Sequence, residues 1–171
     1  MIKHIFTGFW PEIFAQQATD PDADASCLED EFAGTALSAA SFLHGFCNVF
    51  ACELVKTFGY RIEEVRDFEN ALIHTYCVDN ARGYPVYIDI RGATTDVSAF
   101  FETFAEDEPS LSNGPDSHAI EEGWISVARY QDADSYLETH ANLDPGGVLS
   151  LAADAKAFIA ENPEYYRWEI A

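Results

Sequence analysis

The chain is poor in positive charge. Nine lysine and arginine residues stand against thirty aspartate and glutamate residues, which gives a formal net charge of -21 at pH 7. Contacts to nucleic-acid phosphates are made mainly by Lys and Arg, so this deficit argues against direct binding of nucleic acid. A basic protein or peptide is the partner that such a surface favours.

Signals for targeting, membranes and cofactors are also missing. The start of the chain lacks the apolar run of a signal peptide, and no apolar run is long enough to cross a bilayer. Neither a phosphate-binding glycine loop nor a dinucleotide fingerprint is present. We therefore expect a cytoplasmic protein with reduced thiols, no membrane association and no cofactor. The sequence carries no signal for its oligomeric state.

What the chain does contain fits one domain over residues 1–171. Its hydrophobic fraction of 48% is enough to bury a substantial core. No internal repeat and no linker divides it. The patterns predict a core at about residues 41–130, with both helices and strands, and a helical part at about residues 131–171.

A cysteine stands at the predicted start of the first core helix. After Gly45, apolar residues at helical spacing predict a helix from Cys47 to about Phe58, and Gly59 supplies a left-handed end. The free N–H groups and the dipole at a helix start favour the thiolate, which is the nucleophilic form of cysteine. Cys47 is therefore a candidate nucleophile.

A β-hairpin is the clearest local structure. Residues 72–78 and 84–91 are rich in β-branched and aromatic residues and flank a turn sequence that ends at Gly83. A four-residue loop would pair Asp79 with Tyr84 and hence His74 with Asp89. A slip of one residue would send Asp89 to the opposite face, so this inference depends on the loop length.

The remaining elements are less distinctive. We expect a strand at residues 60–66, a helix capped by Thr94 or Thr95, and a flexible loop at residues 106–118. A strand near residues 124–130 and helices at about 133–141 and 148–160 should follow, the last two separated by a break at residues 144–147.

Cys47, His74 and Asp89 would then come from a helix and two successive strands. A cysteine nucleophile needs a base within hydrogen-bond reach and a third group that holds the base in the right tautomer. Each residue also has a purely structural interpretation. Cys47 could be a packing residue, His74 a satisfied core or surface histidine, and Asp89 a turn cap or a partner of Arg91.

The ordered pattern has a family resemblance. The run from Gly45 to Ala51, then His74 inside an apolar strand, then Tyr87-Ile88-Asp89, resembles the core of transglutaminase-like and papain-like cysteine enzymes. The similarity covers roughly residues 41–92. It implies an α+β fold in which a cysteine-bearing helix packs on an antiparallel β-sheet, here with additional C-terminal helices. It also implies hydrolysis, deamidation or transfer at an amide or ester carbonyl of a protein or peptide.

The chain departs from these enzymes at three positions. Transglutaminases proper usually carry tryptophans where this chain has Thr75 and Tyr87, and no glutamine precedes Cys47 at the papain-like spacing. An oxyanion hole would therefore rest on N–H groups at the helix start, with support from Asn48 or His44.

A zinc site is a competing chemistry. His44 and Cys47 are three residues apart, as are His74 and Cys77, and four such ligands could form a tetrahedral site. On a strand, however, His74 and Cys77 point to opposite faces of the sheet. We therefore predict no metal site.

A non-catalytic binder is the alternative function. The composition resembles that of small, very acidic cytoplasmic proteins of phages and mobile elements that block host defence, including anti-CRISPR proteins. Such a DNA mimic would occupy a basic nucleic-acid-binding groove on another protein. Solubility or a salt-adapted host would also explain the acidity.

Overall fold

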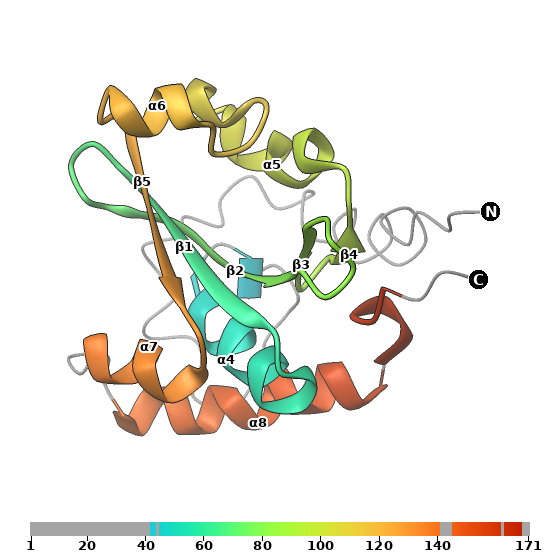
Figure 1. The fold of residues 1–171 in the computed structure, drawn as a ribbon. Coiled ribbons are helices and arrows are strands. Elements are labelled where there is room, and N and C mark those ends of the chain that lie inside the picture. The colour runs from blue at the N-terminus through green and yellow to red at the C-terminus, as the bar shows by residue number, and fades with distance from the viewer. Residues whose placement is uncertain (1–41, 44, 141–144, 162, 169–171) are drawn as a thin grey trace, which may run out of the picture.

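The computed structural model describes residues 42–43, 45–140, 145–161 and 163–168. Within these ranges the fold is α+β, as the sequence predicts, and its centre is a five-stranded antiparallel sheet (Figure 1). The strand order is β4-β3-β2-β1-β5. The strands are β1 (Arg61–Asp67), β2 (Leu72–Asp79), β3 (Val86–Asp89), β4 (Gly92–Thr94) and β5 (Ile125–Tyr130).

Helices cover both faces of the sheet. α4, α7 and α8 lie on one side, and α5 and α6 lie on the other (Figure 1). The helices are α4 (Cys47–Phe58), α5 (Val97–Ala105), α6 (Ser117–Glu121), α7 (Ala133–Thr139) and α8 (Pro145–Glu161), with short 3-10 turns η3 (Pro109–Leu111) and η4 (Pro163–Tyr165). None of the helices in these ranges has both the length and the apolar character needed to cross a lipid bilayer.

Helix α4 begins and ends where the sequence predicts. Cys47 is its first residue, and Gly59 ends it with φ 78° while donating its N–H to the Val55 carbonyl. The residues that follow Cys47 at helical spacing, including Phe50 and Leu54, are buried. The apolar stripe therefore places α4 against the sheet, with its N-terminus at the level of β2.

The predicted hairpin exists, but its predicted register is wrong. Asp79 pairs with Val86 rather than with Tyr84. His74 and Asp89 are therefore not directly opposite each other. The register differs from the expectation by two residues, and because side chains alternate with a period of two, Asp89 stays on the face that we expected.

The longer loop has a local cause. Pro85 has no N–H to donate to the ladder, so pairing starts only after it, and the connection spans residues 80–85. Asp79 stabilises the turn, since its carboxylate accepts the Ala81 N–H at 2.8 Å. Pairing between β2 and β3 continues only to Cys77 and Ile88, beyond which the two strands separate.

Three other boundaries differ from the prediction. Helix α5 is capped by Asp96, whose side chain accepts the Ala99 N–H at 3.0 Å, while Thr94 belongs to β4. Residues 106–118, expected to be a loop, contain η3 and the start of α6. Helix α8 starts at Pro145, inside the predicted break, because proline is well tolerated in a first helical turn.

The layer between α5 and the sheet is mainly aromatic. Phe101 is fully buried, and its ring lies 5.4 Å from that of Tyr76 and 6.1 Å from that of Tyr87. On the opposite face, Cys77 donates its S–H to the Ala51 carbonyl of α4. The sheet thus packs against one layer on the α5 side and another on the α4 side.

We predict that Phe101→Ala lowers the free energy of unfolding by about 3–5 kcal/mol, because it removes a fully buried ring and leaves a cavity. Phe68→Ala is the matched control, since Phe68 is 73% exposed, and should change stability by no more than about 0.5 kcal/mol. Urea unfolding followed by circular dichroism measures both. Equal losses in the two variants would contradict this packing.

Candidate active site

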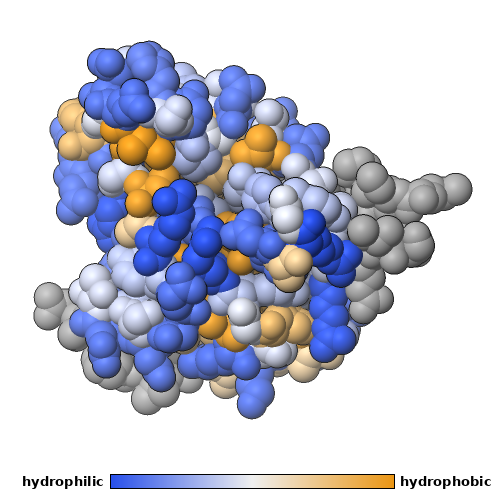
Figure 2. All heavy atoms as spheres, viewed as in Figure 1, coloured by the Kyte–Doolittle hydropathy of each residue, from blue (hydrophilic) through white to orange (hydrophobic). Residues whose placement is uncertain are grey.

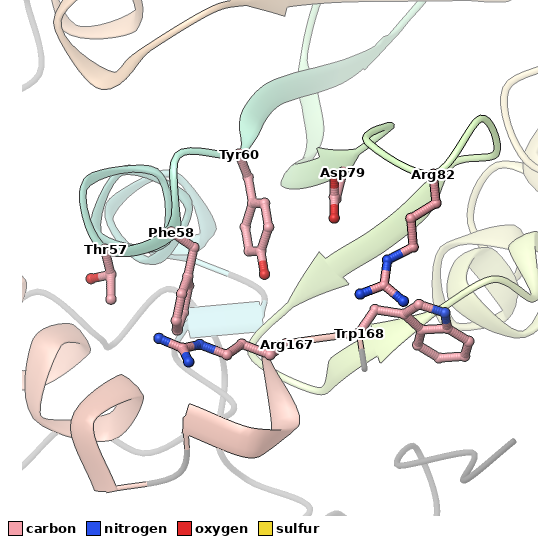
Figure 3. A pocket seen from close by; sticks show the side chains of 7 residues that line it. All are labelled: Thr57, Phe58, Tyr60, Asp79, Arg82, Arg167 and Trp168. Carbon is pink, nitrogen blue, oxygen red and sulfur yellow. The ribbon is translucent and has the colours of Figure 1, made fainter. Parts of the chain in front are cut away.

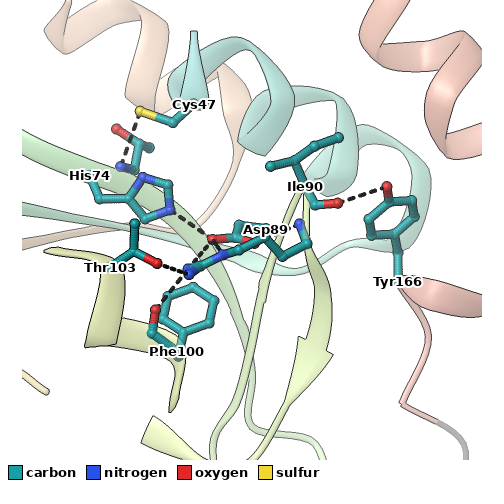
Figure 4. Close-up of polar contacts among 9 residues, drawn as sticks. Cys47, His74, Asp89, Ile90, Phe100, Thr103 and Tyr166 are labelled. Carbon is teal, nitrogen blue, oxygen red and sulfur yellow. Dashed lines mark hydrogen bonds and ion pairs between the residues drawn. The ribbon is translucent and has the colours of Figure 1, made fainter. Parts of the chain in front are cut away.

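Cys47, His74 and Asp89 come together in the structure (Figure 4). His74 Nε2 lies 3.0 Å from Asp89 Oδ2. The backbone N–H of Thr75 donates to Cys47 Sγ over 3.4 Å. All three side chains are buried, with Cys47 5% exposed, His74 fully buried and Asp89 3% exposed. The start of α4 and two strands thus build one polar site inside the fold.

The separation of β2 from β3 makes room for the cysteine. Because pairing between these strands ends at Cys77 and Ile88, the first half of β2 is paired with β1 alone. The N–H of Thr75 therefore has no β3 carbonyl to bond and donates to Cys47 instead. The sulfur occupies the position that a neighbouring strand would otherwise take.

The orientation of His74 suits it to act as a base toward Cys47. Asp89 occupies Nε2, which fixes the neutral tautomer as Nε2–H with Nδ1 free to accept a proton. Nδ1 is buried and forms no aligned hydrogen bond with a described residue. Cys47 is nevertheless close enough for the two side chains to shift each other's pKa. Nδ1 is the nitrogen left for exchange with the thiol.

The electrostatics shift Cys47 toward the thiolate and His74 toward the imidazolium. Burial opposes both charged forms, but it is outweighed in each case. The pKa of Cys47 is lowered because His74 and the Thr75 N–H stabilise the thiolate. The pKa of His74 is raised because Asp89 and Cys47 stabilise the imidazolium. Opposite shifts in two adjacent groups are what an ion pair requires.

The carboxylate of Asp89 is shared between Arg91 and His74. Arg91 contacts it through Nη2 at 2.6 Å from Oδ2 and through Nε at 3.1 Å from Oδ1. Burial alone would raise the pKa of Asp89, but the charge of Arg91 and the hydrogen bond from His74 hold it well below its usual range. The sequence offered His74 and Arg91 as alternative partners of Asp89, and the structure contains both contacts at once.

Aromatic rings of the α5 layer fix the plane of the imidazole. The Phe104 ring stacks on His74 with centroids 4.3 Å apart, and Tyr76 stacks at 5.9 Å. Arg91 Nη2 donates a hydrogen bond to the Phe100 carbonyl at 2.8 Å. The sequence predicts Phe100 and Phe104, one helical turn apart, on one face of this helix, but it does not indicate that they support His74 and Arg91.

A hydrogen bond from the C-terminal segment also supports the site. Tyr166, which is buried, donates its hydroxyl to the Ile90 carbonyl at 3.1 Å, directly after Asp89 (Figure 4). The C-terminal segment is thereby tied to the strand that carries the carboxylate.

The other candidate residues lie around this centre or outside it. Asn48 follows Cys47 in the first turn of α4 and is partly buried, whereas His44 lies outside the described residues. Burial raises the pKa of the Cys52 thiol to about 12 and that of the Cys77 thiol well above its usual range. Cys47 is the only described cysteine whose pKa is lowered.

No set of three or more His, Cys, Asp or Glu side chains in the described ranges is arranged to hold a metal ion. His74 stacks on α5 while Cys77 bonds to α4, so the two zinc candidates do lie on opposite faces of the sheet. One of the other proposed ligands, His44, is not among the residues described.

A separate open pocket lies near the C-terminal segment (Figure 3). Its volume is about 300 Å³, and Arg167 lies over the Phe58 ring at 5.1 Å. Its lining residues are Thr57, Phe58, Tyr60, Asp79, Arg82, Arg167 and Trp168. None of the three candidate catalytic residues belongs to it, so the cysteine site is distinct from this pocket.

Comparison with known proteins adds no family assignment. No protein-family model matches the chain, and neither a curated protein nor a solved structure matches it. The resemblance to cysteine enzymes therefore stays a prediction from the sequence.

We predict that iodoacetamide labels Cys47 faster at pH 7 than it labels Cys52, which has the same exposed fraction of 5%, while Cys77 stays largely unlabelled. Because the pKa of Cys47 is lowered, its labelling should persist as the pH falls below about 8.5, the pKa of a free thiol. Mass-spectrometric peptide mapping resolves each cysteine.

The pH profile also tests the role of His74. His74→Asn should move the Cys47 profile to higher pH, because it removes the group that stabilises the thiolate. Limited access of the reagent lowers the labelling rate at every pH, whereas thiolate formation sets the pH at which the rate rises. The shape of the pH profile therefore separates the two effects. A profile centred on the free-thiol pKa in the unmodified protein would rule out an activated cysteine.

Proposed function

We propose that the protein carries out cysteine-dependent acyl-group chemistry: hydrolysis, deamidation or transfer at an amide or ester carbonyl of a protein or peptide. One observation carries the proposal. Asp89 holds Nε2 of a buried histidine, and the remaining ring nitrogen is left for a cysteine of lowered pKa at the first residue of a helix.

The spatial arrangement supports the related fold as well as the chemistry. α4 begins with the cysteine and packs on an antiparallel sheet, of which β2 carries His74 and β3 carries Asp89. Transglutaminase-like and papain-like enzymes use this order of elements. We infer a core of that kind, extended by α7 and α8.

In the proposed reaction, the Cys47 thiolate attacks the carbonyl carbon and forms a C–S bond. N–H groups at the start of α4, with Asn48 beside them, stabilise the oxyanion. As the C–N or C–O bond breaks, the His74 imidazolium donates its proton to the leaving amine or alcohol. The product of this half-reaction is a thioester on Cys47.

In the second half-reaction, water or an acceptor amine attacks the thioester. His74 takes the proton from this nucleophile, and the C–S bond breaks to release the Cys47 thiolate. Asp89 keeps the ring in one tautomer and stabilises its charge throughout. Proton transfer by a positioned side chain of this kind contributes about 10²–10⁴-fold to a rate.

Substrate access requires the site to open. Cys47 is 5% exposed and the adjacent His74 is fully buried. Enclosure strengthens the charge interactions of the site, and movement that admits substrate is a common step in enzymes with enclosed centres. The enclosed sulfur accepts the Thr75 N–H and lies beside His74, and these polar contacts support a catalytic role over a packing role.

We predict that p-nitrophenyl acetate acetylates Cys47, releases p-nitrophenolate and adds one acetyl group to the intact mass. His74→Asn should slow this reaction by about 10²-fold or more, because the thiolate and the proton donor are both lost. Cys47→Ala should abolish it, and Cys52→Ala, on the same helix, is the control that should retain it. Circular dichroism verifies that each variant is folded. Release that survives Cys47→Ala would refute the proposal.

Binding of a basic partner is a second candidate function. Five of the basic residues pair with carboxylates of the chain itself and so leave the surface strongly acidic; they are Lys56, Arg61, Arg66, Arg91 and Arg129. Such a surface supports an inhibitor of the phage anti-defence type, which would occupy a basic nucleic-acid-binding groove.

For this second function we predict competition with DNA for a purified RNA-guided nuclease, weakening steeply as salt is raised. Cys47→Ala should compete as well as the unmodified protein, since no chemistry is involved. Fluorescence anisotropy of labelled DNA reports the displacement. Absence of competition at low salt would count against this function for that class of target.

A further inference from the structure

Exposed apolar side chains gather at one end of the sheet. The large apolar residues that are most exposed in the described chain are Phe68, Leu72, Tyr84, Ile120 and Trp124. All except Tyr84 lie where the β1–β2 turn meets the junction of α6 and β5. Figure 2 shows apolar residues in this region, below α6 and framed by hydrophilic ones. We name Phe68, Leu72, Ile120 and Trp124 the corner patch.

Strand register brings the two most exposed members together. Asp67 pairs with Ile125 at the end of the β1–β5 ladder. The next residues outward are Phe68 and Trp124, which are 73% and 48% exposed. Both aromatic side chains lie just beyond the paired ends of the strands and are exposed to solvent. Covering this apolar surface would be favourable in free energy.

The other two members flank this pair. Leu72 opens β2 opposite Arg66, one residue before the end of β1, and is 40% exposed. Ile120 lies in α6, which is joined closely to Trp124, since the Trp124 N–H donates to the Ala119 carbonyl at 3.0 Å. The patch thus spans a turn, a strand start and a helix end.

Acidic residues frame the patch. Glu69 lies in the β1–β2 turn beside Phe68, and Glu121 and Glu122 follow Ile120; all three are exposed. The nearest arginine on β1, Arg66, is paired with Glu64 at 2.5 Å and so does not neutralise this rim. The patch therefore combines an apolar centre with a negative border.

We propose that the corner patch is a docking surface for a basic polypeptide. Apolar anchors of that polypeptide would pack on Phe68 and Trp124, while its Lys and Arg side chains meet the rim. A second copy of this chain would set the carboxylates of both rims against each other. An anionic lipid surface would be repelled in the same way.

The patch lies close to the cysteine site. Leu72 is two residues before His74 on β2, a distance of about 7 Å along a strand. A polypeptide docked on the patch is therefore near Cys47, and we infer that it is the substrate. This last step rests on the proposed acyl chemistry, whereas docking itself does not.

The test uses two synthetic amphipathic peptides with the same Leu and Phe face, one with Lys and one with Glu at every polar position. The full chain is titrated with each, and NMR shifts together with calorimetry report site and affinity. The Lys peptide should shift the indole N–H of Trp124 and the amides of Phe68 and Leu72, and should bind more weakly as salt is raised.

Matched variants separate the patch from general attraction to a protein of charge -21. Phe68→Ser should weaken binding of the Lys peptide by roughly tenfold. Tyr84→Ser, an exposed aromatic away from the patch, should leave binding unchanged. Shifts spread over the whole acidic surface, equal losses in both variants, or equal binding of the Glu peptide would overturn the proposal. So would concentration-dependent dimerisation that is lost in Phe68→Ser.

Failure of docking and failure of the chemistry give different results. Acetylation of Cys47 by p-nitrophenyl acetate does not need the patch, and peptide binding should be the same in Cys47→Ala. If the peptide binds and Cys47 is inert, docking stands without the enzyme. If Cys47 is acetylated and the peptide does not bind, the enzyme stands without this docking surface.

Discussion

The Asp89 carboxylate, held between Arg91 and His74, is the interaction on which the site depends. A charge enclosed in the fold is costly unless it is paired and hydrogen-bonded, and removing one partner of such a pair typically costs about 3–5 kcal/mol. Arg91 keeps the carboxylate ionised, and the ionised carboxylate keeps Nε2–H of His74 in place. The position and tautomer of the histidine therefore follow from an ion pair with a neighbouring arginine.

That ion pair also links the layers of the molecule. Arg91 bonds to the Phe100 carbonyl and to Thr103 Oγ1, so α5 is fastened to β3 through the group that orients His74. On the other side of the sheet, α4 brings Cys47 to β2 at the point where β3 has separated. Helix and strands thus meet at a defect in the hydrogen-bond ladder. Such a defect offers unpaired backbone donors, which a regular sheet does not.

The distribution of charge connects the interior with the surface. Most of the few basic residues are used within the fold, several of them against buried carboxylates such as Glu63 and Glu64. Glu69, Glu121 and Glu122 are exposed and form no ion pair with another described residue, and they border the corner patch. An acidic surface attracts basic chains, and in our proposal the apolar patch is where they bind. Either proposed function, a hydrolase with basic substrates or an inhibitor of a basic target, would use this surface.

Local sequence determined the elements that short-range rules govern. The apolar spacing after Gly45 and the left-handed Gly59 fixed α4 and put Cys47 at its start, and the β-branched runs fixed the hairpin. Its register needed the loop length, which Pro85 and the Asp79 side chain extend from four residues to six. The expected contact of His74 with Asp89 survived this error because a shift by an even number of residues preserves the face.

Only the tertiary structure decided the rest. The bond from Thr75 to Cys47, the contact of His74 with an Asp89 that also pairs with Arg91, and the stacking of Phe104 on His74 join segments that no periodicity relates. The tertiary structure also decides that Phe68 and Trp124 are exposed. From the sequence alone an aromatic residue is expected in the core, and its exposure depends on where the neighbouring strand and helix lie. The sequence by itself determined that a cysteine begins a helix. The packing of α4 on the sheet decided that Cys47 lies beside His74, which Asp89 orients. Contacts between segments distant in the chain depend on how the layers pack and how long the loops are, and local sequence patterns do not determine either.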